Sequence, residues 1–297
     1  MSQKTASAFN RSFIIGLVVP ILILGILGGI WTLLPRWFSE PPVVESLTLS
    51  TTLDGPPLAD IALQEGITTS VVAYGEVSTK AGCGALLKGA AQVEARWHYS
   101  DDVAKGITVS CTVVGCSQES ALKSRYACTV PLPFFTRATD EGSLHPEVVW
   151  VVGVRGTAYG EFSEERTVTA EVLTLTAVEV PSVLQYGDIN EGGISGNTPL
   201  VVRNTGNNPR TTLSIAGTDF ACNAGKAPVS LLHYGFNSQE PYEARNALTK
   251  EAARVPTALP VQISTTDIVQ QSLHMMVKAP RGVGDDCKNR LTLSAGS

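Results

Sequence analysis

The chain has 297 residues, long enough for two domains of ordinary size and an anchoring segment. Its formal net charge is −5, and its basic residues are scattered among acidic ones. This argues against a nucleic-acid partner, because proteins that bind nucleic acid gather Lys and Arg on one face. Charged residues make up only 16%; Thr, Ser, Val and Gly take their place, a bias typical of strand-rich proteins with many turns.

A long apolar segment near the N-terminus, residues 13–34, predicts a single transmembrane helix. It contains 22 residues and no charge. At about 1.5 Å of rise per residue it spans roughly 33 Å, enough for the hydrocarbon core of a bilayer. Trp31, Trp37 and Phe38 cluster at its C-terminal end, where aromatic rings favour the headgroup layer.

The flanking charges orient this helix. Lys4 and Arg11 precede it, so residues 1–12 are expected in the cytoplasm and the bulk of the chain outside the cell membrane. The alternative is a cleaved signal peptide, whose apolar core is shorter and ends at a small-x-small site. The sequence after the helix, Pro35-Arg36-Trp37-Phe38, is a poor cleavage context, which favours retention.

Gly25 and Gly29 form a G-x-x-x-G motif within the predicted helix. Such a motif lets two helices approach closely, so a homo-oligomer packed through these glycines is one hypothesis. Glycine is common in transmembrane helices in any case, and the motif alone does not decide the oligomeric state.

All six cysteines follow the predicted helix: Cys83, Cys111, Cys116, Cys128, Cys222 and Cys287. An even number on the expected outer side predicts disulfides, and no spacing matches a pair of zinc ligands. If two units fold separately, Cys222 and Cys287 have only each other. The other four allow three pairings, of which we favour Cys111–Cys116 with Cys83–Cys128.

After a short linker, residues 35–42, the apolar pattern over residues 43–180 has a period of two, which predicts strands. The alternation is clearest over Gln92–Tyr99, where Val93 and Trp97 share one face. The other expected strands are Val43–Thr51, Ile67–Val77, Ile107–Val114, Arg125–Leu132, Val148–Val154 and Thr167–Val180. Strands at this density, separated by turn residues, indicate a β-sandwich.

A second unit is expected over residues 181–297. Its predicted strands are Ser182–Tyr186, Leu200–Arg203, Thr211–Ala216, Val229–His233, Leu259–Thr265, Ser272–Lys278 and Arg290–Ser294. The segment Asn204–Pro209 predicts a compact turn. Only Glu240–Val255 has a helical pattern, with Pro241 acceptable in a first turn. The fold class expected from this pattern is therefore all-β, with two tandem β-sandwiches after the anchor.

Four short motifs mark the second unit: Tyr186-Gly187-Asp188-Ile189, Glu191-Gly192-Gly193, Val201-Val202-Arg203-Asn204-Thr205-Gly206-Asn207 and Ile215-Ala216-Gly217-Thr218-Asp219-Phe220. With them it resembles Ig-like domains of surface proteins from archaea and uncultured small-genome bacteria. The first unit is similar to the domain that often precedes it there, with residues 77–83 in place of a V-T-D-x-N-G-C turn. The Asp and Asn of that turn are absent here. The resemblance implies a surface-exposed protein and transfers no catalytic residue.

Residues that could carry chemistry do not form a recognisable constellation. His98, His145, His233 and His274 follow no metal-binding spacing, and neither a G-x-S-x-G nor a phosphate-loop motif occurs. The acidic pairs Asp101-Asp102 and Asp285-Asp286 could hold calcium, although solvated turn carboxylates are commoner. Trp97, Tyr99 and Trp150 could line a sugar-binding face, but their alternation favours core packing. Phe134-Phe135 either forms an exposed contact or packs as a loop on the core.

These observations favour a membrane-anchored, non-enzymatic surface protein that needs no cofactor and binds an unknown protein or envelope component. One alternative is an accessory subunit of an envelope assembly such as a pilus or secretion apparatus. Another is an extracytoplasmic hydrolase, which a deep pocket with convergent polar groups would favour.

Overall fold

A computed structural model describes residues 40–89, 91–158 and 160–296. The predicted transmembrane segment, residues 13–34, and its Gly25 and Gly29 lie outside the described residues. Within the described ranges, none of the helices is both long and apolar enough to cross a bilayer. Nearly all the regular structure there is β, so the expectation of an all-β fold is confirmed.

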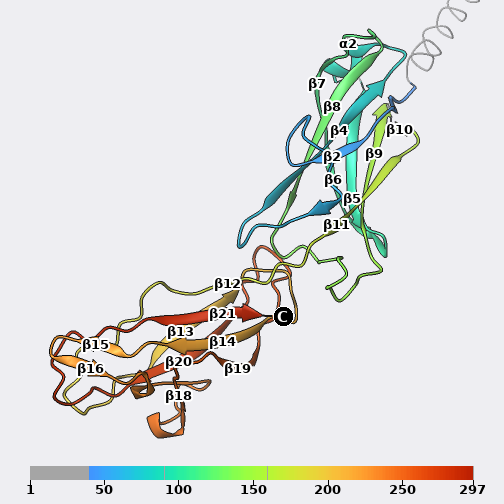
Figure 1. The fold of residues 1–297 in the computed structure, drawn as a ribbon. Coiled ribbons are helices and arrows are strands. Elements are labelled where there is room, and N and C mark those ends of the chain that lie inside the picture. Colours follow the sequence, from blue (N-terminus) through green and yellow to red (C-terminus); the bar gives the residue numbers. More distant parts are fainter. Residues whose placement is uncertain (1–39, 90, 159, 297) are drawn as a thin grey trace, which may run out of the picture.

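The first group of strands, β1 to β11, forms two sheets (Figure 1). One has the order β1-β4-β8-β7, with β2 also paired to β4; the other has the order β3-β11-β9-β5-β6, with β10 paired to β9. The elements are β1 (Val43–Val44), β2 (Thr48–Ser50), β3 (Asp60–Ile61), β4 (Thr69–Ser78), α2 (Cys83–Leu87), β5 (Gln92–Tyr99), β6 (Asp102–Ser110), β7 (Thr112–Cys116), β8 (Lys123–Leu132), β9 (Trp150–Ala158), β10 (Glu161–Phe162) and β11 (Arg166–Val172).

The inward faces of these sheets share one hydrophobic cluster. Ala73 of β4 and Tyr126 of β8 meet Trp97 of β5 and Val152 of β9, all of them fully buried. The strand predicted at Gln92–Tyr99 has those bounds, and its alternating Val93, Ala95 and Trp97 face the core. Full burial of an apolar side chain such as Val93 or Val152 contributes about 1.5–3 kcal/mol.

Three disulfides join the six cysteines: Cys83–Cys116, Cys111–Cys128 and Cys222–Cys287. The favoured pairing within the first four was wrong. Cys111 immediately precedes the extended strand β7 and Cys116 ends it, so the two residues lie roughly 16 Å apart at about 3.3 Å per residue, which is too far for a bridge. The β7–β8 register, with Thr112 opposite Ala127, places Cys111 beside Cys128 instead.

The second group of strands, β12 to β21, forms a sheet of order β12-β13-β20-β17-β18, a sheet of order β19-β14-β21 and the pair β15-β16. The elements are β12 (Val178–Glu179), β13 (Thr198–Asn204), β14 (Thr212–Gly217), β15 (Phe220–Cys222), β16 (Gly225–Ala227), η1 (Val229–Leu231), β17 (Leu232–Gly235), η2 (Tyr242–Ala244), β18 (Asn246–Ala247), β19 (Ala253–Ala258), β20 (Gln270–Val277) and β21 (Leu291–Gly296). Leu200, Ile215 and Leu273 lie in its own hydrophobic cluster.

Several predicted elements in this region were wrong. The segments Ser182–Tyr186 and Leu259–Thr265 are not strands. The helix predicted at Glu240–Val255 is replaced by the single turn η2 and the strands β18 and β19. The guanidinium of Arg245 is the physical reason, because it is buried and bonds to the carbonyls of Glu240 and His274, which holds the chain in a loop.

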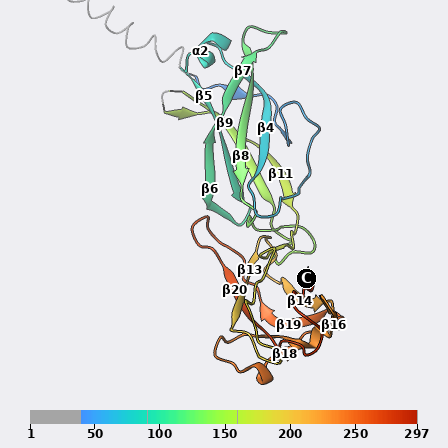
Figure 2. The same cartoon turned by 90° about the vertical axis from the view of Figure 1, so that its left-hand side faces the viewer.

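The strand predicted at Thr167–Val180 is divided between the two groups. β11 ends at Val172 and belongs to the first, whereas Val178 and Glu179 of β12 pair with Asn204 and Arg203 of β13 in the second. Figures 1 and 2 show the second group at the opposite end of the first group from α2. The chain therefore passes between the two groups through residues 173–177.

Candidate binding groove between the two strand groups

A polar segment, residues 204–209, begins at the last residue of β13 and lies where the two strand groups meet; we call it the junction loop. Asn204, Thr205, Asn207 and Asn208 are each at most 6% exposed. Asparagines are seldom this buried unless their amides are bonded. The sequence predicted this segment as a compact turn, and its burial against another part of the chain was not foreseen.

Asn207 satisfies its whole side-chain amide with backbone groups from the first strand group and the connection. Its Oδ1 accepts from the Leu175 N–H at 2.6 Å, and its Nδ2 donates to the carbonyls of Thr136 at 2.9 Å and Leu173 at 3.1 Å. Asn208 Nδ2 donates to Thr176 Oγ1 at 2.8 Å. These bonds fix the loop against the connection rather than leaving it free.

Close backbone packing completes this junction. A Cβ at Gly206 would overlap the carbonyl of Leu175, so only glycine fits there. Nearby, the Gly66 N–H donates to the Thr205 carbonyl at 3.1 Å, and the Thr205 hydroxyl donates to Glu65 at 3.0 Å. The two strand groups are thus hydrogen-bonded through several separate segments.

Beside this loop lies a groove with a volume of about 470 Å³. Its walls come from the ends of β5 and β9, from β6, from the segment after β8, from the junction loop and from the loop before β20. Three of its apolar lining residues are exposed: Ile107 at 42%, Leu144 at 42% and Ile263 at 80%. Exposed apolar side chains gathered around a hollow are a common feature of binding surfaces.

An aromatic and cationic stack forms one wall of the groove. The ring of Tyr99 lies 4.0 Å from that of Trp150, and the Arg137 guanidinium lies 3.9 Å from the Tyr99 centroid. The Tyr99 hydroxyl accepts a 2.9 Å hydrogen bond from the Arg137 backbone N–H. Burial raises the pKa of Tyr99 to about 12, so the phenol is neutral at ordinary pH.

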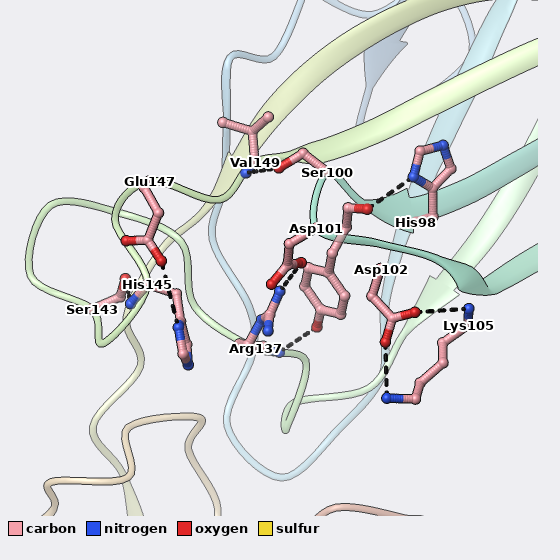
Figure 3. Close-up of polar contacts among 11 residues, drawn as sticks. His98, Ser100, Asp101, Asp102, Lys105, Arg137, Ser143, His145, Glu147 and Val149 are labelled. Carbon is pink, nitrogen blue, oxygen red and sulfur yellow. Dashed lines mark hydrogen bonds and ion pairs between the residues drawn. The ribbon is translucent and has the colours of Figure 1, made fainter.

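Two ion pairs, Arg137–Asp101 and Lys105–Asp102, lie at this wall, as Figure 3 shows. Arg137 Nη2 lies 2.6 Å from Asp101 Oδ1, and that hydrogen bond lowers the pKa of the Asp101 carboxyl. Lys105 Nζ lies 2.8 Å from Asp102 Oδ2, and its hydrogen bond lowers the pKa of Asp102 in the same way. Each carboxylate faces its own cation, so the rim holds fixed charges of both signs.

The residues that the sequence suggested for binding have different positions here. Trp97 is fully buried in the first core, while Tyr99 and Trp150 pack on the same core and also line the groove. Phe135 lines the groove, and its ring meets that of Phe134 at 5.3 Å.

The four histidines are spread over both groups. His98 Nδ1 contacts the Tyr99 carbonyl at 3.0 Å, and His145 Nδ1 lies 3.7 Å from Glu147. His274 contacts the Asn197 side chain, and His233 stacks on Tyr242.

The acidic pairs do not assemble into a cation site in the described ranges. Asp101 and Asp102 turn toward Arg137 and Lys105, as above, and the Asp285 carbonyl accepts a backbone hydrogen bond from Asn223. Across residues 40–296, less positions 90 and 159, no group of three or more His, Cys, Asp or Glu side chains is placed to hold a metal.

The comparisons with known proteins give distant likenesses only. No family model matches the sequence, and no curated protein matches it. A complex of chaperone and tip adhesion subunit from Csu pili of Acinetobacter baumannii matches over 84% of this chain and 99% of that chain, with a TM-score of 0.34 and 11% identity. A chaperone–tip adhesin complex of CFA/I fimbriae matches over 88% of this chain and 91% of that chain, with a TM-score of 0.31 and 8% identity.

The C-terminal domain of the antigen I/II-family protein AspA from Streptococcus pyogenes covers 87% of this chain and 96% of that one, with a TM-score of 0.24 and 10% identity. TM-scores this low do not establish a shared fold.

Proposed function

We propose that this chain is a membrane-anchored extracytoplasmic protein that binds another protein without catalysing a reaction, and that the groove beside the junction loop is its contact site. In this proposal residues 13–34 form the anchor, residues 1–12 lie in the cytoplasm, and each strand group is an Ig-like sandwich displayed outside. The observation that carries the proposal is the exposed apolar lining of the groove, above all Ile263 at 80% exposure.

The dimensions and chemistry of the groove support a protein ligand. Pockets of about 300–1,000 Å³ enclose a drug-sized ligand, so a groove of about 470 Å³ is large enough to take a few side chains of a partner. Aromatic and apolar side chains form the walls, as in the centres of protein interfaces. The ion pairs of Asp101 and Asp102 provide a polar rim that can orient a partner.

The location also supports the proposal. Three disulfides fit an oxidising compartment outside the cytoplasm.

The groove is also formed in the free chain. The hydrogen bonds of Asn207 and Asn208 hold its walls together before any partner binds. A preformed site loses less conformational entropy on binding.

Cross-linking on intact cells tests this proposal. Full-length chain carrying Ile263→Asp is compared with Ile268→Asp, a matched control: Ile268 is also exposed, at 55%, in the same loop, but does not line the groove. A charge in the groove is expected to lower the amount of cross-linked partner about tenfold, which corresponds to roughly 1.4 kcal/mol of binding free energy. Equal capture by both variants would refute the groove as contact site.

A second candidate function is that of an assembly subunit whose anchor packs against a neighbouring helix. Gly25 and Gly29 favour it, since a G-x-x-x-G surface permits close helix contact. Replacing both glycines with Leu is expected to dissociate such an assembly, measured by native gel mobility of the detergent-extracted chain. Unchanged mobility would leave the groove as the proposed contact.

A further inference from the structure

The end of the first strand group farthest from the groove carries exposed apolar side chains. We call it the N-terminal tip and define it as α2, the β7–β8 connection (residues 117–122) and the β9–β10 hairpin. Leu87 of α2 is 56% exposed, Leu122 is 51% exposed and Phe162 of β10 is 51% exposed. Figure 1 shows α2 and β10 at the end where the described chain begins, and Figure 2 shows α2 at the same end.

Hydrogen bonds and strand pairing hold the three parts of the tip together. The Thr79 N–H donates to the Leu122 carbonyl, and the Cys83 N–H donates to the Ala121 carbonyl, each at 3.0 Å. The Cys83–Cys116 disulfide links α2 to β7. The hairpin joins through β9, where Thr157 lies between Phe162 on one side and Gln92 on the other.

The start of the described chain is fixed to this same tip. Glu40 pairs with Lys80, just before α2, at 2.6 Å. Val43 pairs with Ser78 at the end of β4. The Pro42 carbonyl packs so closely on β9 that a Cβ at Gly156 would overlap it. Residue 40 and the tip therefore move as one body.

Chain length then limits how far the tip can lie from the membrane, an argument that rests on the proposed anchor. Between Leu34, the last residue of the predicted helix, and Glu40 the chain reaches at most roughly 20 Å. If Trp37 and Phe38 lie in the headgroup layer, Glu40 is within about 7 Å of Phe38 and about 11 Å of Trp37.

We propose that the N-terminal tip rests on the bilayer surface, with Leu87, Leu122 and Phe162 in contact with lipid. The contact is apolar rather than electrostatic, because the exposed carboxylates of Glu119 and Glu161 outnumber the exposed Lys88, and Lys80 is paired with Glu40. The Arg155 guanidinium, 3.8 Å from the Phe162 ring centroid, is likewise paired with Glu94. The apolar contact sets the first strand group upright on the membrane and directs the groove away from it.

Site-specific photocross-linking in zwitterionic phosphatidylcholine vesicles tests this inference. The full chain is reconstituted with a photoreactive amino acid at position 87, 122 or 162, and lipid adducts are measured by mass spectrometry. Position 268 is the matched control, since Ile268 is 55% exposed but lies in the second strand group. All four positions are exposed, so the photoreactive side chain does not enter a core. Formation of the three disulfides, checked under non-reducing conditions, verifies that each variant has folded.

Lipid adducts several-fold more frequent at the tip positions than at position 268 are expected. Equal adduct levels at all positions would overturn the inference and leave the anchor intact. Cross-links from the tip to a second copy of the chain would also overturn it, because the tip would then be a protein interface. Release of the chain from vesicles by alkaline carbonate would refute the anchor itself, and with it the proposed function.

Discussion

The side-chain amide of Asn207 donates a 2.9 Å hydrogen bond to the backbone carbonyl of Thr136, across the boundary between the two strand groups. Thr136 lies in the segment after β8, and Asn207 lies in the loop after β13, so the contact joins residues 71 positions apart. With the further bonds to Leu173 and Leu175, one buried amide holds one side of the groove in place.

Asn207→Ala is expected to lower the free energy of unfolding by about 2–3 kcal/mol, since one buried and two half-buried backbone groups lose their partner. Amide hydrogen exchange should rise at Leu175, whose N–H donates to the Asn207 side chain. Asn190→Ala, at an exposed asparagine, is the control and should change stability by less than about 0.5 kcal/mol. A loss no larger in Asn207→Ala than in the control would show that this amide does not hold the junction.

The disulfides give a second prediction, of pairing and of relative effect. Peptide mapping without reduction should recover Cys83 with Cys116 and Cys111 with Cys128. In the chain-entropy model, replacing both Cys222 and Cys287 should cost about 4 kcal/mol, and replacing Cys111 and Cys128 about 3 kcal/mol. The order follows from sequence separations of 65 and 17 residues.

Denaturant titration of the two double variants measures that order. Recovery of a disulfide-linked Cys111–Cys116 peptide would contradict the pairing. A larger loss of unfolding free energy for the shorter loop would contradict the entropic account.

Alkaline stability should depend on Tyr99. Burial raises its pKa from 10.0 to about 12, so the folded state holds the phenolic proton more tightly than the unfolded chain. The stabilisation is present below pH 10 and is lost as the pH rises from about 10 to 12. Across that interval Tyr99 contributes a slope of up to about 1.4 kcal/mol per pH unit.

Tyr99→Phe should therefore flatten the fall of stability above pH 10. At neutral pH it should cost about 1 kcal/mol, because the Arg137 N–H loses its acceptor. The test is to measure the denaturant midpoints of unfolding of the unmodified protein and of Tyr99→Phe from pH 7 to 11.5. Parallel curves above pH 10 would mean that Tyr99 does not ionise differently in the folded and unfolded chains.

Local patterns in the sequence predicted the strands better than they predicted the contacts between strands. The alternation from Gln92 to Tyr99 reports which side chains face a core, and the structure agrees. The disulfide pairing depends instead on the register of β7 against β8, which places Cys111 near Cys128. Register is a tertiary property of two strands, and spacing along one of them does not contain it.

The groove was less accessible to prediction for the same reason. Tyr99, Leu144, Asn207 and Ile263 belong to four separate segments that only the folded chain brings together. Ile263 was expected within a strand, where alternation would have made its exposure ordinary. The available signal for the groove was the presence of three asparagines, Asn204, Asn207 and Asn208, in one short segment. Such a segment can form a hydrogen-bonded junction as well as a surface turn.

Arg245 provides the last prediction, because it explains why the expected helix at Glu240–Val255 is absent. Its side chain is 4% exposed and donates to the Glu240 and His274 carbonyls and to Asn197 Oδ1, at 2.6–2.9 Å. Arg245→Met keeps a long apolar side chain but leaves these acceptors without a donor, so it should cost about 3 kcal/mol of unfolding free energy.

Arg254→Met, at an exposed arginine of β19, is the control and should be nearly neutral. Circular dichroism separates two outcomes for the Arg245 variant. Loss of stability with an unchanged β spectrum would agree with the role of Arg245 in the loop. A gain of helical signal would show that the helical propensity of this segment is suppressed by Arg245 alone, whereas unchanged stability would contradict its role entirely.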